Sequence, residues 1–170
     1  DSSRRPGVMW PPAAGAISPS ELLCMLNRHH YRSTTPEKYA TLFLAVYHHE
    51  RRILSYANTG HLPPLLLRHD GRMEKLTTGG TVLGLFEEIS VAEEEVQLEP
   101  GDLMVAYSDG ITEPENEFGE FGEARLMQLL RENSHLPVER ISEEVTQAVS
   151  DWIGGAEQPD DWTLLLARPR

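Results

Sequence analysis

Carboxylate groups in this 170-residue sequence stand at the ends of two apolar, strand-like runs. Asp109 follows the run 103–108, and the pair Asp160 and Asp161 precedes the run 162–167. If the two strands are neighbours, these carboxylates converge at one end of a sheet. Clustered carboxylates without cysteine or paired histidines suit hard cations, Mg²⁺ or Mn²⁺. Such an ion activates water at neutral pH and can hold a phosphoryl group.

The same residues also allow plainer interpretations. An aspartate–glycine pair after a strand, as at Asp109-Gly110, is most often only a turn. The pair His48-His49 points to opposite faces of an extended chain and His29-His30 diverges on a helix, so the histidines do not predict a zinc site. The sequence has no P-loop and no G-x-S-x-G elbow, and no motif ties Ser108 to a histidine. These observations favour a metal site over a serine hydrolase.

The charge balance excludes some partners. The chain carries 27 acidic and 15 basic residues, for a net charge of −12. This negative field disfavours nucleic acid and anionic membranes, while solubility and cation collection both remain possible reasons for it. No apolar run approaches the roughly 20 residues of a membrane span, and no signal peptide is recognisable. With one cysteine, Cys24, interpreted as a small core residue, we expect a reducing, cytoplasmic location.

Local patterns predict the elements that would position these carboxylates. Ser18 and Glu21 form a capping box that predicts a helix ending near residue 30. The continuous apolar run 40–47 predicts a strand buried on both faces, and Asp70-Gly71 predicts a hairpin. Further strands are expected over 52–58, 91–98, 103–108 and 162–167, and helices over 123–132 and 138–153, the last with an apolar stripe that includes Val145.

Strands in meander order, two helices and a closing strand predict an α+β fold with helices packed on an antiparallel sheet. Residues 1–17 lack hydrophobic periodicity and are expected to be an irregular tail, whereas 18–170 should belong to one domain. No internal repeat or low-complexity segment interrupts this pattern.

Four ordered segments carry a resemblance to a known family. They are NTGHLPPLL at 58–66, GGTVLGLF at 79–86, the stretch 98–113 with LEPGD and YSDGITE, and DDWTLL at 160–165. In order and spacing they resemble the SpoIIE/RsbU branch of the bacterial type 2C (PPM) protein serine/threonine phosphatases. The resemblance implies an antiparallel β-sandwich flanked by helices. It also implies two Mn²⁺ or Mg²⁺ ions that activate water for hydrolysis of phosphoserine or phosphothreonine.

The resemblance assigns roles to individual residues. Asp109 matches the metal-binding aspartate of the S/T-D-G motif, and Asp160 matches the ligand of the D-D/N-x-T/S motif. Asp161 occupies the neighbouring position, where it would bind more weakly or orient other groups. Gly110 would let the backbone turn close to the metals.

A further segment of the resemblance is expected to be structural. Asn58, Gly60 and His61 belong to a segment similar to the family's N-A-G-H loop, with Thr59 in place of alanine. We interpret this segment as a turn between strands on the side of the active site.

The resemblance also implies partners. The substrate would be a phosphorylated anti-sigma-factor antagonist, so the enzyme would regulate a sigma factor in signal transduction and stress response. An upstream sensor domain would complete such a protein.

One family feature is not found. The family carries an earlier aspartate, in a D-x-S-G-H-G stretch, that bridges both metals, and nothing before Ser18 matches it. We therefore expect this chain to be the C-terminal part of a phosphatase domain with an incomplete metal site. The alternatives are a catalytically incomplete phosphatase-fold module that only binds a partner, and an α+β domain with accidental motifs.

Overall fold

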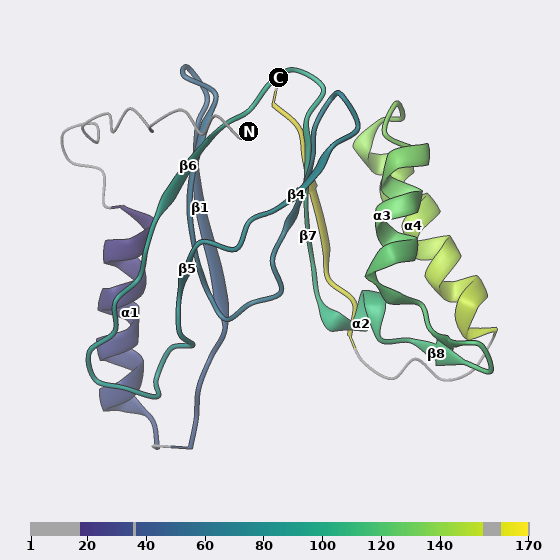
Figure 1. The fold of residues 1–170 in the computed structure, drawn as a ribbon. Helices are drawn as coiled ribbons and strands as arrows, with labels where there is room; N and C mark the ends of the chain where they lie inside the picture. The colour runs from purple at the N-terminus through teal and green to yellow at the C-terminus, as the bar shows by residue number, and fades with distance from the viewer. Residues whose placement is uncertain (1–17, 36, 155–160, 170) are drawn as a thin grey trace, which may run out of the picture.

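The protein, seen in a computed structural model, is described for residues 18–35, 37–154 and 161–169. Two β-sheets pack face to face, with helix α1 outside the first and helices α3 and α4 outside the second (Figure 1). This α+β sandwich agrees with the predicted fold class. The elements are α1 (Pro19–Ser33), β1 (Leu42–His48), β2 (Ile53–Thr59), β3 (Leu65–Leu67), β4 (Met73–Lys75), β5 (Gly79–Gly80), β6 (Glu94–Gln97), β7 (Leu103–Tyr107), α2 (Asp109–Thr112), β8 (Glu115–Asn116), β9 (Gly119–Glu120), α3 (Gly122–Glu132), α4 (Val138–Ile153) and β10 (Leu164–Ala167).

Helix α1 begins at the predicted capping box. The Ser18 hydroxyl accepts the Glu21 backbone N–H at 3.2 Å, and the Glu21 carboxylate accepts the Ser18 N–H at 3.4 Å. The helix continues to Ser33, beyond the predicted end near residue 30. Thr34 holds this last turn, because its hydroxyl donates to the carbonyl of His30 at 2.8 Å.

The first sheet is centred on β2, which is buried along its whole length. Strand β1 pairs with one edge of β2, while β5 and β6 share the other edge, so the predicted simple meander is wrong. The prediction that 40–47 is buried on both faces is also wrong, because β1 is an edge strand whose Val46 and Tyr47 are exposed. The strand predicted over 91–98 is shorter and covers only β6.

A close approach of two strands explains the paired glycines of the 79–86 segment. Strand β5 runs parallel to the end of β2, with Gly79 opposite Asn58. A Cβ atom at position 79 would lie 1.7 Å from the carbonyl oxygen of Asn58. Any side chain there would separate the strands, so this pairing requires glycine.

The second sheet has the strand order β10-β7-β3-β4. Strands β3 and β4 form the predicted hairpin around Asp70-Gly71. Leu103, Val105 and Tyr107 of β7 pack against α3 and α4. The apolar stripe predicted for α4 is confirmed, since Val145 and its helical neighbours Ile141 and Val149 are buried in this core.

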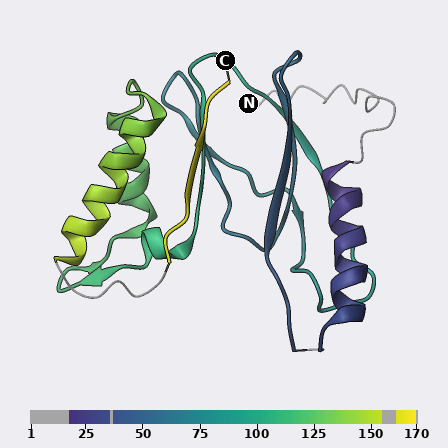
Figure 2. The same ribbon diagram turned by 180° about the vertical axis from the view of Figure 1, so that it is seen from behind.

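Among the residues that the structure describes, each sheet has an unpaired edge strand on the same side of the sandwich. Strands β1 and β10 are both edge strands, and both face the viewer in Figure 2. Leu165 of β10 is 51% exposed and Tyr47 of β1 is 38% exposed. Unpaired strand edges flanked by exposed apolar side chains are typical places for a further strand to add. Within the described ranges, no helix is long and apolar enough to cross a membrane.

Candidate active site

Asp109 lies immediately beyond the central strand of the second sheet. The plainer interpretation of Asp109-Gly110 was a turn, and the structure has the one-turn helix α2, which begins at Asp109. The side chain of Asp109 is exposed, and its Oδ1 accepts the backbone N–H of Gly110 at 2.9 Å. Within the described residues this is the only hydrogen bond to the carboxylate, which leaves most of its lone pairs accessible to a ligand.

Strand β10 brings the last predicted motif beside Asp109. It runs antiparallel to β7, with Leu164 opposite Tyr107. Beyond this pair, the backbone N–H of Ser108 donates to the carbonyl of Thr163 at 3.0 Å. The Ser108 hydroxyl accepts the N–H of Thr163 at 2.9 Å and donates to the carbonyl of Asp161 at 3.2 Å. Ser108 therefore fastens the segment after β7 to the segment before β10.

At Gly110 the backbones of the two segments approach closely. A Cβ atom at this position would lie 2.5 Å from the carbonyl oxygen of Asp161 and 3.4 Å from Cδ1 of Trp162. Backbone oxygen cannot yield as a flexible side chain can, so only glycine permits this approach. We had predicted that Gly110 lets the backbone turn close to metals, and that role stays a prediction.

The structure thus places Asp109 and Asp161 on two segments in direct contact, both with exposed side chains. Asp160, the second ligand predicted from the resemblance, lies outside the described residues. In the part of the chain that the structure describes, no group of three or more His, Cys, Asp or Glu side chains could hold a metal ion. The donor chemistry of Asp109 and Asp161 fits Mg²⁺ or Mn²⁺, but two carboxylates are fewer than the oxygen ligands these ions need.

The N-T-G-H segment forms the turn that ends β2. The Asn58 side chain accepts the N–H of His61 at 2.8 Å and donates to the carbonyl of His61 at 3.0 Å. Gly60 lies between them with a positive φ of 76°. The turn after β2 and helix α2 lie at the same end of the two sheets, the lower end in Figure 1. These contacts give the segment a local folding role, while its link to the active site stays a prediction.

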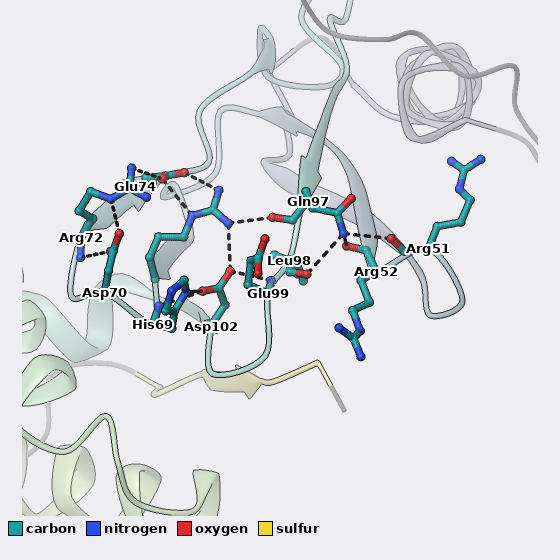
Figure 3. A network of polar contacts seen from close by, with 11 residues as sticks. Arg51, Arg52, His69, Asp70, Arg72, Glu74, Gln97, Leu98, Glu99 and Asp102 are labelled. Carbon is teal, nitrogen blue, oxygen red and sulfur yellow. Dashed lines mark hydrogen bonds and ion pairs between the residues drawn. The ribbon is translucent and has the colours of Figure 1, made fainter. Parts of the chain in front are cut away.

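A second carboxylate, Asp102, lies at the other end of β7 and is completely buried. It accepts the backbone N–H groups of His69 at 2.9 Å and Glu99 at 3.0 Å, and the Arg68 guanidinium at 2.9 Å (Figure 3). Arg68 also forms two bonds of 2.9 Å to Glu74.

This network around the buried Asp102 joins the two sheets. Arg68 and Asp102 flank strands β3 and β7 of the second sheet, and Arg68 donates to the carbonyl of Gln97 in β6 of the first sheet at 2.8 Å. Burial alone would raise the pKa of Asp102, but the two N–H donors and Arg68 outweigh it and lower that pKa. Asp102 is therefore held as a charged structural group.

The side chain of Tyr107, the last residue of β7, is held on the face of the second sheet that packs against α3 and α4. Its hydroxyl donates to Glu123 of α3 at 2.8 Å, and Lys75 lies 2.6 Å from the same carboxylate. Burial, followed by the bond to Glu123, raises the pKa of Tyr107. This anchor restrains the end of the strand that leads into Ser108 and Asp109.

Sequence reasoning missed two positioning roles. Ser108 was interpreted as a strand end, as part of the S/T-D-G motif and as an unsupported hydrolase nucleophile, and Asp102 only as part of a family motif. A sequence signal for the role of Ser108 did exist, because each aspartate motif contains a hydroxyl residue close to its aspartate. These hydroxyl residues are Ser108 and Thr163. For Asp102, the signal was an aspartate placed between the turn at Pro100-Gly101 and an apolar strand.

Comparison with known proteins decides the family. The sequence profile described as stage II sporulation protein E (SpoIIE) matches residues 12–170. The chain belongs to the SpoIIE family of PP2C phosphatase domains. The resemblance seen in the four segments is therefore confirmed, and the enzyme class of the family, protein serine/threonine phosphatases, agrees with the prediction.

Individual relatives of this SpoIIE-family chain cover most of it. Protein IcfG of Synechocystis is 32% identical over 130 residues, which make up 75% of this chain and 20% of IcfG. Phosphoserine phosphatase RsbU of Bacillus subtilis is 28% identical over 153 residues, 89% of this chain and 45% of RsbU. The SiaA PP2C domain of Pseudomonas aeruginosa has the same fold, with a TM-score of 0.79 and 20% identity over 91% of this chain and 62% of that chain.

The chain therefore spans less than half of either sequence relative and under two thirds of the SiaA domain chain. It covers only part of a PP2C domain. Its relation to the SpoIIE family extends over both aspartate motifs, since the profile match includes residues 109 and 160–161.

Proposed function

We propose that this chain forms the C-terminal part of a metal-dependent phosphatase domain that removes phosphate from phosphoserine or phosphothreonine in a protein. The observation that carries the proposal is the contact between the Asp109 and Asp161 segments through Ser108 and Gly110, in a chain of the SpoIIE family. The segments bring two exposed carboxylates to one end of the sandwich. This is the arrangement expected for half of a site that binds hard cations.

In this proposal Asp109 and Asp160 hold Mn²⁺ or Mg²⁺, and Asp161 assists or orients. When bound, these ions activate water and neutralise the phosphoryl oxygens. The protein's own contribution is rigidity, since Ser108 fixes both segments and Gly110 keeps their backbones in contact. Fixed ligands align the attacking water, and alignment is a large part of the rate.

The missing ligand must come from outside the two aspartate motifs. We propose that the native domain supplies it from a preceding segment that carries the family's bridging aspartate. The open edges of β1 and β10, on one side of the sandwich, are suitable places for strands of that segment to pair.

The proposed protein substrate is a phosphorylated anti-sigma-factor antagonist, and its dephosphorylation would activate a sigma factor in the cytoplasm. The support is the match to RsbU, a phosphoserine phosphatase, over 89% of this chain. An upstream sensor domain is proposed on the same basis, because RsbU is more than twice as long as the matched region. The alternative function, binding a partner without catalysis, would use the same fold.

The test compares the 170-residue chain with a form extended upstream in its native gene. Both are assayed with manganese and with chelator, on p-nitrophenyl phosphate and on the serine-phosphorylated antagonist encoded in the same genome. We expect manganese-dependent turnover by the extended form, weak or no turnover by the short chain, and loss of activity on Asp109→Ala. Glu139→Ala, which removes an exposed carboxylate at the far end of α4, is the matched control and should remain active.

Two results would contradict the proposal. Equal, robust turnover by the short chain would show that its ligand set is already complete. An extended form that binds the phosphoprotein but hydrolyses neither substrate would support the partner-binding alternative.

A further inference from the structure

The hairpin that follows α2 exposes an aromatic side chain. Strands β8 and β9 form a short antiparallel pair, and Phe118 lies between them at the tip. Its exposed fraction is 75%, the largest of any large hydrophobic residue in the described ranges. Phe121, three residues later, is only 3% exposed. The same hairpin therefore buries one phenylalanine and leaves the other in water.

The exposed position of Phe118 is fixed by bonds to the end of α4. Asn116 accepts the N–H of Phe118 at 2.8 Å and donates to the carbonyl of Trp152 at 2.9 Å. The Trp152 indole N–H donates to the carbonyl of Gly119 at 3.1 Å. Both strands of the hairpin are thus tied to one tryptophan.

Trp152 is itself held from two sides. Phe121 packs edge-on against its ring, with centroids 6.1 Å apart, and the Arg125 guanidinium lies 4.0 Å from the ring centroid. The hairpin is therefore a rigid support. An aromatic side chain carried on a rigid backbone loses less conformational entropy on binding than one on a flexible loop, and aromatic residues are enriched at the centre of protein interfaces.

The hairpin is also directly connected to the candidate active site. Only the rest of helix α2 and two further residues separate Asp109 from β8, and both elements lie at the lower end in Figure 1. Glu113, Glu115 and Glu117 are exposed around the tip, and no ion pair neutralises them within the described part of the chain. This surface, an aromatic tip with an acidic rim, would complement an apolar spot flanked by basic side chains.

We propose that Phe118 determines specificity for the protein substrate, by contacting the folded phosphoprotein beside its phosphoserine. This inference rests on the proposed function, because it takes the Asp109 end of the sandwich as the catalytic end. A small phosphoester would reach the metal site without touching the hairpin. Phe118 therefore acts on protein substrates alone and has no part in the chemical step.

The experiment uses the extended, manganese-loaded form and the variant Phe118→Ser. We expect KM for the phosphorylated antagonist to rise about tenfold, the effect of losing one aromatic anchor. Turnover of p-nitrophenyl phosphate should not change. Phe86→Ser is the matched control, because Phe86 is 59% exposed, lies in the loop under α1, and is held by the bond from Asn27 to its carbonyl. This control should leave both substrates unaffected.

A binding measurement keeps this inference separate from the proposed function. Calorimetry with the 170-residue chain and the phosphorylated antagonist should show weaker binding for Phe118→Ser than for Phe86→Ser, whether or not any form is active. Raising the salt concentration should weaken binding of the unaltered chain. An unchanged KM and affinity for Phe118→Ser, an equal loss for Phe86→Ser, or an equal loss on p-nitrophenyl phosphate would each overturn the inference.

Discussion

Strand β7 has an aspartate near each end, and the two have opposite environments. Asp102, directly before the strand, is completely buried and accepts bonds from two backbone N–H groups and Arg68. Asp109, beyond the other end of β7, is exposed and accepts one bond from its neighbour Gly110. Both belong to family-like motifs, LEPGD and SDG, but among the described residues only Asp109 keeps carboxylate lone pairs that no protein donor occupies.

The difference shows how one strand can serve stability at one end and chemistry at the other. Protein donors that occupy all the lone pairs of a carboxylate stabilise its charged form and leave no lone pair for an ion. A carboxylate left exposed on a rigid segment contributes little to folding, but it can bind a cation from solvent. Three measurements test this contrast between Asp102 and Asp109.

The largest expected effect is on stability. Asp102→Ala should lower the free energy of unfolding by about 3–5 kcal/mol, because Arg68 and two backbone N–H groups lose their buried acceptor. The matched change Asp109→Ala should alter it by no more than about 0.5 kcal/mol. Chemical denaturation of the two variants measures both values, and similar losses for the two would refute the division of roles.

A smaller effect is expected at the contact between the aspartate segments. Gly110→Ala places a methyl group 2.5 Å from the Asp161 carbonyl oxygen, so the segments must separate. The cost to stability should be about 1–3 kcal/mol, typical of overpacking. Manganese-dependent turnover by the extended form should fall by more than the loss of folded protein can explain, because the ligands move apart. A variant that keeps full activity would show that this contact does not position the site.

The smallest effect concerns acid stability. Folding lowers the pKa of Asp102, so its ionised form stabilises the folded protein. This contribution is fully present above the unfolded-state pKa of about 3.9. It is lost as the pH falls through the lower folded-state pKa. The difference in unfolding free energy between the unaltered chain and Asp102→Asn should therefore be constant above about pH 5 and shrink below pH 4. A difference that does not vary across this range would mean that charge on Asp102 is unimportant.

Local sequence patterns predicted the elements well where the signal lies within a few neighbouring residues, as in an apolar stripe, a helix cap or a turn. The stripe through Val145 became the buried face of α4, the box of Ser18 and Glu21 started α1, and Asp70-Gly71 formed a hairpin. The predictions failed for β1, because a continuous apolar run does not reveal whether a strand lies at an edge. They also failed for the parallel pairing of β5 with β2, since pairing partners depend on contacts between distant segments.

The sequence by itself determined which carboxylates flank strands, and their motifs indicated the SpoIIE family. Tertiary structure alone decided that Ser108 bonds to Thr163 and Asp161, residues more than 50 positions away, and that Asp102 is buried against Arg68. The physical reason is that residue type and spacing fix local conformation. Whether a carboxylate's lone pairs are filled by the protein or left for a ligand depends on the neighbours that folding brings to it.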